Sequence, residues 1–140
     1  GFKPLIDEHA VDMVHPDLAT AGGILETKKI GDYAEQAGIA MAMHFAGTPV
    51  SFMANLHCAA ATENVMALEH HSVDVDWWEN LVTGVEKPLH KDGFARVPEG
   101  PGLGIELNLD VVKEHLERGQ ELFAPTDEWN RERSNDRLWS

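Results

Sequence analysis

The sequence predicts an α/β fold built on a parallel sheet. Three short apolar runs lie between residues 11 and 68, and a helical pattern separates each run from the next. A short apolar run bounded by turn residues is typical of a buried strand, and apolar residues at helical spacing are typical of a crossover helix. Strand, helix, strand, helix, strand in this order indicates a βαβαβ arrangement with right-handed crossovers.

The first elements follow from the apolar pattern and its breaks. Residues 2–10 are interpreted as the end of a helix, or as a helix with its exit loop, and residues 11–14 form the first apolar run, which Pro16 ends. Periodicity alone does not distinguish so short a run from a piece of helix. The next segment favours a strand, because apolar residues recur at helical spacing over residues 24–37 after the breaker Gly22-Gly23.

The same βα unit then starts again. Residues 39–43 form a second uninterrupted apolar run, and residues 50–61 form a second helix that is apolar nearly all round. The alanines of this helix indicate close packing against its neighbours. Residues 65–68 form the third apolar run, which completes the predicted three-stranded sheet.

The pattern changes after residue 72. Trp77-Trp78 opens a short amphipathic stretch, and residues 85–97 alternate around Lys91-Asp92-Gly93 as in a hairpin. Residues 98–104 are rich in Gly and Pro and are expected to form a loop, and residues 110–118 are expected to form a helix. The last twenty residues, with Trp129 and Trp139, are interpreted as a surface tail held by its aromatic side chains.

Charge and composition argue against several classes of function. The 140 residues carry a formal net charge of −13, whereas binding a nucleic-acid backbone needs clustered Lys and Arg. No apolar stretch approaches the roughly 20 residues that span a bilayer, and the single Cys58 cannot form an internal disulfide. We therefore expect a cytoplasmic protein with no nucleic-acid or membrane partner. The start at Gly1, without an initiator Met or a targeting segment, is interpreted as the middle of a longer polypeptide.

An ionisable residue follows each of the three apolar runs. Asp17 follows the first run, His44 the second and Glu69 the third. The carboxyl ends of parallel strands meet at one edge of a sheet, where α/β proteins place their sites. Strands lie about 4.8 Å apart, so Asp17 is expected to reach a nitrogen of His44. A carboxylate behind an imidazole fixes its tautomer, which suits general acid or base catalysis.

Each of these residues also has a simpler structural interpretation. Asp17 could cap the next helix, although Gly22-Gly23 separates it from the first helical turn, and His44 could be a hydrogen-bonded core histidine. His15 could share the face of Asp17 as a substrate contact, or could be a buried hydrogen-bonding residue. The remaining candidates are weaker: we interpret His70 and His71 as loop residues beside the site, His57 as structural, Cys58 as a small core residue, and His9, His90 and His115 as exposed.

Four motifs carry a resemblance to a known family. They are VDMVHPD at residues 11–17 with AGGILETKKI at 21–30, AEQAGI at 34–39 leading to His44, LHCAAAT at 56–62 leading to Glu69, and VPEGPGLGI at 97–105. Together they resemble the sixth to eighth strand regions and the following segment of the enolase superfamily, mandelate racemase subgroup. The tail from Gly119 resembles loosely that of the acid-sugar dehydratases in this subgroup.

This resemblance implies a role for each strand-end residue. Asp17 and His44 would form the Asp–His dyad, with His44 acting on the carbon next to the substrate carboxylate. Glu69 would hydrogen-bond a carboxylate oxygen as charge builds there. The loop with Gly47 and Thr48, the neighbouring His15, and the region of Trp77 would contribute substrate contacts. Mg²⁺ would be the cofactor, with its three carboxylate ligands on earlier strands upstream of this chain and none here.

The resemblance also implies an architecture and an activity. Because a complete (β/α)₈ barrel takes about 250 residues, this chain would supply the last three βα units over residues 1–76. Residues 77–140 would return to an α+β capping domain and form the tail, with the N-terminal part of the same barrel as partner. The implied function is a Mg²⁺-dependent sugar-acid dehydratase, commonly a homo-oligomer. A racemase, epimerase or cycloisomerase of the superfamily is the first alternative, and a non-catalytic fragment the second.

Overall fold

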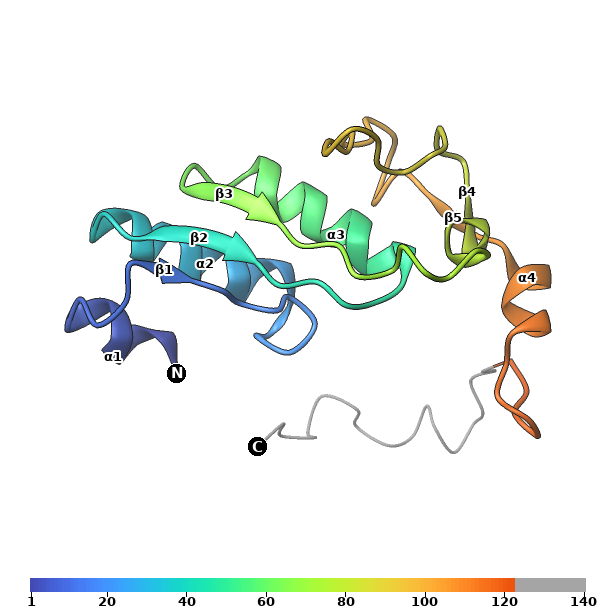
Figure 1. Ribbon diagram of the computed structural model, residues 1–140, viewed down its shortest axis with the longest axis horizontal. Helices are drawn as coiled ribbons and strands as arrows, with labels where there is room; N and C mark the ends of the chain where they lie inside the picture. Colours follow the sequence, from blue (N-terminus) through green and yellow to red (C-terminus); the bar gives the residue numbers. More distant parts are fainter. Residues whose placement is uncertain (123–140) are drawn as a thin grey trace. The chain divides into compact units, whose positions relative to one another are not determined.

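The computed structural model describes residues 1–122 and contains the predicted alternation of strands and helices. The predicted tail around Trp129 and Trp139 lies outside the described residues. The first six elements are, in chain order, α1 Phe2–Asp7, β1 Met13–Val14, α2 Gly23–Gln36, β2 Ala40–Met43, α3 Pro49–Ala60 and β3 Val65–Leu68 (Figure 1). They are followed by the 3₁₀ helix η1 Trp78–Leu81, β4 Val82–Thr83, β5 Glu106–Leu107 and α4 Leu109–Glu114.

The three predicted strands form one parallel sheet in the order β1-β2-β3. Met13 pairs with Ala40 at the start of β1 and β2, and Met43 pairs with Leu68 at the ends of β2 and β3. Figure 1 shows the arrows of β2 and β3 pointing the same way, so their carboxyl ends meet at one edge. The prediction of an α/β parallel sheet is confirmed, although β1 is shorter than the apolar run that predicted it.

A first hydrophobic core lies between this sheet and its two crossover helices. Met41 and Met43 of β2 are fully buried there, together with Ala34 of α2 and Cys58 of α3, so the interpretation of Cys58 as a core residue is confirmed. Gly31 of α2 makes the close approach possible. A Cβ at that position would stand only 2.4 Å from the side chain of Thr62, which is closer than atoms can pack.

A second hydrophobic core lies beside the carboxyl ends of the strands. Its buried members are Phe45, Phe52, Met53, Leu56, Trp78, Val82 and Leu89. Segments far apart in the sequence meet here, because β4 pairs with β5 antiparallel, with Val82 opposite Leu107. This core packs α3 against residues 78–97 and thereby fixes the loops next to the strand ends.

The hairpin predicted over residues 85–97 does not form. Only its turn is present: Lys91 and Phe94 exchange two backbone hydrogen bonds of 2.8 and 2.9 Å. Pro88 and Pro98 lie at either side and have no N–H to donate to a ladder. The apolar residues of the segment pack instead into the second core, where Leu89 is 3% exposed.

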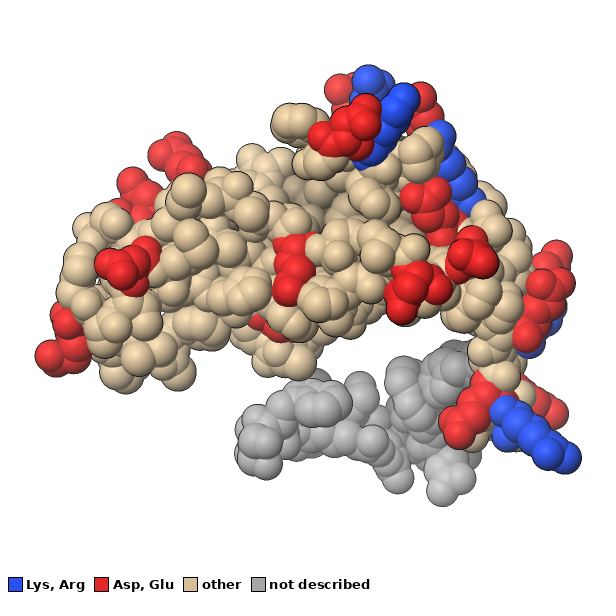
Figure 2. Space-filling model, viewed as in Figure 1, with Lys and Arg blue, Asp and Glu red and all other residues tan. Residues whose placement is uncertain are grey.

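The described chain divides into two compact units. The first comprises residues 1–108, and the second begins at Leu109 with α4, which is shorter than the helix predicted over residues 110–118. The predicted boundary after residue 76 stays a prediction. Among the described residues, no helix is long and apolar enough to cross a membrane. Figure 2 shows Asp and Glu side chains scattered over one face, with broad uncharged areas over the strands.

Candidate active site at the carboxyl ends of the strands

The backbone ladder places the three predicted residues side by side. The N–H of His44 donates to the carbonyl of Pro16 at 3.0 Å, and the N–H of Glu69 donates to the carbonyl of Met43 at 2.9 Å. Asp17 and His44 form a parallel bridge beyond the ends of β1 and β2. Backbone pairing therefore continues just past the ends of the strands, and the residues in this last pairing are Asp17, His44 and Glu69.

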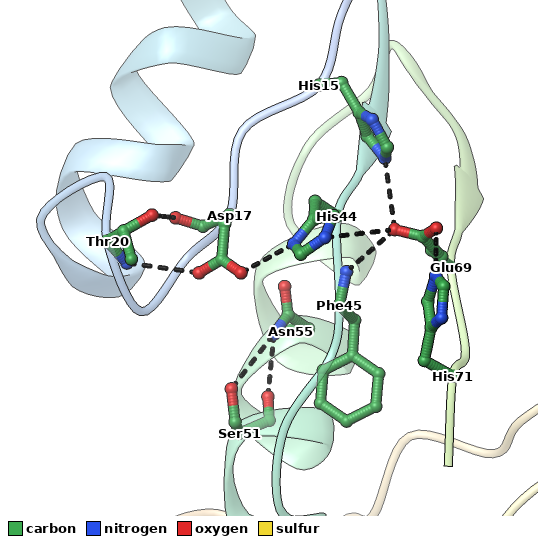
Figure 3. A network of polar contacts seen from close by, with 9 residues as sticks. All are labelled: His15, Asp17, Thr20, His44, Phe45, Ser51, Asn55, Glu69 and His71. Atoms are coloured by element: carbon green, nitrogen blue, oxygen red, sulfur yellow. Dashed lines mark hydrogen bonds and ion pairs between the residues drawn. The ribbon is translucent and has the colours of Figure 1, made fainter. Parts of the chain in front are cut away.

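Asp17 and His44 are in direct contact. Nδ1 of His44 lies 2.6 Å from Oδ2 of Asp17, so the proximity predicted from strand spacing is confirmed (Figure 3). The backbone N–H of Thr20 donates to the other oxygen, Oδ1, at 3.1 Å. Burial raises the pKa of Asp17, but hydrogen bonds from His44, Thr20 and Ala19 outweigh it, so the pKa lies below its usual value.

The ionised Asp17 determines how His44 presents its other nitrogen. A carboxylate only accepts hydrogen bonds, so Nδ1 of His44 carries the hydrogen of this contact. In the neutral ring, Nε2 then holds a lone pair, and it points away from Asp17 toward Glu69, 3.7 Å from Oε2 (Figure 3). The His44 side chain as a whole is 39% exposed. His44 is thus oriented as a base.

Glu69 is surrounded by hydrogen-bond donors. The backbone N–H of Phe45 donates to Oε2 at 3.3 Å, and Nε2 of His71 lies 2.5 Å from Oε1. The hydrogen bond with His71 is the main cause that lowers the pKa of Glu69, with the N–H of Phe45 acting in the same direction against partial burial. Glu69 is therefore a carboxylate at neutral pH and accepts hydrogen bonds unless a neighbour supplies a proton.

Two further histidines lie at the rim of the site. His15, at the end of β1, has Nε2 3.6 Å from Oε2 of Glu69 and its ring centroid 5.6 Å from that of His44. His71 contacts the opposite oxygen of Glu69. Their side chains are 49% and 57% exposed. Of the two interpretations left open by the sequence, the exposure of His15 excludes a buried hydrogen-bonding residue, and His15 lies at the same edge as Asp17.

The loop after β2 is held by Trp78, whose contact with this loop the sequence did not predict. Nε1 of Trp78 donates to the carbonyl of Gly47 at 2.7 Å, and the hydroxyl of Ser72 donates to the same carbonyl at 3.3 Å. Thr48, the N-cap of α3, is exposed next to Gly47. Trp77, the predicted substrate contact, is 38% exposed at the start of η1. The burial of Trp78 could have been predicted from the sequence, because Val75, Trp78 and Val82 share helical spacing, and all three pack in the second core.

The remaining histidines lie away from this edge. His70 is half-buried among the rings of Phe52, Trp78 and His90, so it is not beside the mouth of the site as expected. His90, expected to be exposed, is half-buried against it, with ring centroids 4.0 Å apart. His57 has Nε2 3.3 Å from the carbonyl of Leu103, which agrees with a structural role.

The part of the chain that the structure describes contains no group of three or more His, Cys, Asp or Glu residues arranged to hold a metal ion. Asp17 and Glu69 are each occupied by histidine contacts. The placement of Mg²⁺ ligands upstream of this chain stays a prediction.

Comparison with known proteins connects this edge to a family. Residues 1–111 match the family model "Enolase C-terminal domain-like". The chain is 44% identical over 123 residues to a D-xylonate dehydratase of Haloferax volcanii, covering 88% of this chain and 29% of the relative. It thus spans less than a third of the length of that curated relative.

Two solved structures share the fold. A mandelate racemase/muconate lactonizing enzyme-like protein from Rubrobacter xylanophilus superposes with a TM-score of 0.82 at 38% identity, over 88% of this chain and 31% of that protein. An enolase from Pantoea ananatis, with bound D-gluconate and Mg, superposes with a TM-score of 0.73 at 31% identity, over 84% and 28%. The chain therefore belongs to the enolase C-terminal domain-like family, and its sheet is the last part of an enolase-superfamily (β/α)₈ barrel.

Proposed function

We propose that this segment supplies the proton-transfer edge of a Mg²⁺-dependent acid-sugar dehydratase, a hydro-lyase. The observation that carries the proposal is the Asp17–His44 pair, with Nε2 of His44 directed toward Glu69 and the His44 side chain 39% exposed. The named D-xylonate dehydratase and the enolase with bound D-gluconate support sugar acids as the substrate class. The proposed substrate is thus a small sugar acid.

The first step is removal of the proton on the carbon next to the carboxylate. Such a proton is very weakly acidic, so a base is effective only if the enediolate is stabilised as it forms. Nε2 of His44 takes the proton, and Asp17 holds the ring in the required tautomer and stabilises the imidazolium that results. Mg²⁺, when bound by residues elsewhere in the protein, would neutralise charge on the substrate carboxylate.

The second step is loss of the 3-hydroxyl as water. The electron pair of the enediolate forms a double bond between carbons 2 and 3 while the carbon–oxygen bond at carbon 3 breaks. The resulting enol becomes a 2-keto-3-deoxy acid. Glu69 lies 3.7 Å from Nε2 of His44, and to donate a hydrogen bond to a substrate oxygen it needs a proton, for which His15 and His71 are the neighbouring sources.

The rest of the barrel is proposed to come from the remainder of the same polypeptide. Met13 of β1 and Met66 of β3 are 42% and 71% exposed, and exposed apolar side chains on a parallel sheet call for a covering layer. Homo-oligomer formation stays a prediction.

The test uses the full-length protein that carries these residues, after its intact mass has been measured. With Mg²⁺ present, D-xylonate, D-gluconate and D-galactonate are screened for formation of a 2-keto-3-deoxy acid. Formation of that product by the wild type, with none from His44→Asn, supports the proposal. Exchange of the α-hydrogen with solvent without a change of formula would instead identify a racemase or epimerase. Absence of any Mg²⁺-dependent turnover would favour a non-catalytic role.

A further inference from the structure

We propose that His15 is the general acid that protonates the departing 3-hydroxyl, which rests on the proposed dehydratase function. Elimination of water needs two proton transfers, one from carbon 2 and one to the oxygen on carbon 3. His44 is built for the first transfer. A hydroxide is a poor leaving group, so the second transfer needs a donor close to the base.

The geometry places His15 where that donor is needed. Nε2 of His15 and Nε2 of His44 both lie within 3.7 Å of one oxygen, Oε2 of Glu69, and they approach it from different strands (Figure 3). The two groups that they would serve are on adjacent carbon atoms of the substrate. Two nitrogens that converge on one point can therefore reach both groups without movement of the backbone.

The partners of the two rings assign opposite roles. Asp17 holds Nδ1 of His44, so the free nitrogen of His44 in the neutral ring is an acceptor. The Nε2 of His15 faces a carboxylate oxygen at 3.6 Å, which favours a hydrogen on that nitrogen. This distance is too long for a hydrogen bond, so the N–H remains available to a substrate oxygen placed between them.

His71 is the only other imidazole in contact with Glu69 among the described residues, and it is less suited to this task. Its Nε2 lies 2.5 Å from Oε1, so its N–H is already committed to Glu69. His71 is also the more exposed of the two, at 57% against 49% for His15. His71 can hold Glu69 in position, whereas His15 is left to act on substrate.

The proton balance closes with these two histidines. His15 starts this step as the imidazolium. His44 gains the proton from carbon 2 and becomes charged, His15 gives its Nε2 proton to the hydroxyl and becomes neutral, and water leaves. The enol then moves its own hydroxyl proton through solvent to carbon 3. Transfer of a proton from His44 to His15 through solvent restores both rings, so the cycle consumes only the sugar acid.

The test compares two leaving groups in the full-length protein with Mg²⁺. One substrate is the sugar acid that the wild type dehydrates, and the other is its 3-deoxy-3-fluoro analogue, because fluoride leaves with much less help from an acid. His15→Gln is expected to lower kcat for the hydroxyl substrate about 100-fold or more, and to lower fluoride release less than about 10-fold. His44→Asn is expected to lose both activities, because it removes the common first step.

Fluoride release by His15→Gln also shows that this variant is folded and still removes the α-proton. An equal loss of kcat on both substrates, or a rise in KM alone, would overturn the role of His15 while the dehydratase function stands. Absence of product and of fluoride with the wild type would overturn the dehydratase function and the role of His15 together.

Discussion

Two groups of histidines meet at residues 69–71 and differ in their partners. His15, His44 and His71 surround Glu69 and keep 39–57% of their side chains exposed. His70 lies among aromatic rings, and both of its ring nitrogens are buried without a hydrogen-bond partner. Burial is the main cause that lowers the pKa of His70, with the charge of His90 acting in the same direction. The same residue type thus lies partly exposed around Glu69 in one group and packs among aromatic rings in the other.

The largest expected effect is on the group of histidines around Glu69. Replacement of His44 by Asn in the full-length protein removes the base and is expected to lower kcat by about 10³–10⁴-fold, near the upper end for a general acid–base residue. The thermal midpoint should change little, because His44 follows the end of β2 and lies outside the core. Steady-state kinetics and thermal unfolding measure both. His9→Asn, an exposed position outside both groups, is the matched control, and wild-type kcat in His44→Asn would refute the assignment.

The next effect concerns Asp17, the carboxylate partner that sets His44 apart from the packed histidine His70. Asp17→Asn keeps the shape of the side chain but allows the opposite tautomer of His44, so kcat is expected to fall about 100-fold. Asp17 has a lowered pKa, so the carboxylate is present across the neutral range and its loss should move the pH–rate profile. The profile of kcat between pH 5 and 9 is the measurement. An unchanged profile would break the proposed dyad.

A smaller effect tests how the second hydrophobic core supports the loop beside the candidate site. Trp78→Phe keeps an aromatic ring in the second core but removes the hydrogen bond from Nε1 to Gly47. We expect a loss of about 1 kcal/mol in unfolding free energy and a rise of a few fold in KM. Ser72→Ala removes the longer bond to the same carbonyl and should have less effect on both. Equal effects of the two variants would show that Trp78 does not hold the loop.

The smallest effect concerns His70 and the pH dependence of stability. Its pKa is lowered in the folded protein, so below the ordinary imidazole pKa of about 6.5 the unfolded chain binds a proton that the folded chain does not. Stability therefore falls as pH drops below this value, until the folded-state pKa is passed. His70→Phe removes the titrating group and should flatten this part of the curve, which denaturant unfolding at a series of pH values measures. His9→Asn should leave the slope unchanged, and a slope in His70→Phe as steep as in the wild type would contradict the prediction.

The sequence predicted the residues around Glu69 better than the aromatic packing around His70. His44 and Glu69 follow their apolar runs directly and Asp17 lies three residues after its run, so the apolar pattern and the parallel topology were enough to bring them to one edge. The orientation of His70 was missed because a loop position does not show which way its ring turns. The stacked pair of His70 and His90 depends on contacts between residues 20 apart in the chain, and local pattern carries no information on such contacts.

Local pattern also misled where proline intervened. Alternation over residues 85–97 predicted paired strands, but the ladder needs N–H donors that Pro88 lacks, and Leu89 packs into the core instead. The segment that does pair, Glu106–Leu107 with Val82–Thr83, is only two residues long on each side. Such short pairing depends on how the second core packs, and residue types alone do not predict that packing.

The two backbone bonds that tie His44 to Pro16 and Glu69 to Met43 have a consequence for assembly. A slip of one residue between β2 and β3 would turn the side chains at the pairing step to the opposite face, which would remove Glu69 from His44. Turnover would then vanish even in a molecule of native compactness and helix content. Activity would therefore report whether the strands are in the correct register. After refolding, kcat would measure the fraction of molecules with correct register, whereas circular dichroism would measure only the fraction with native helix content.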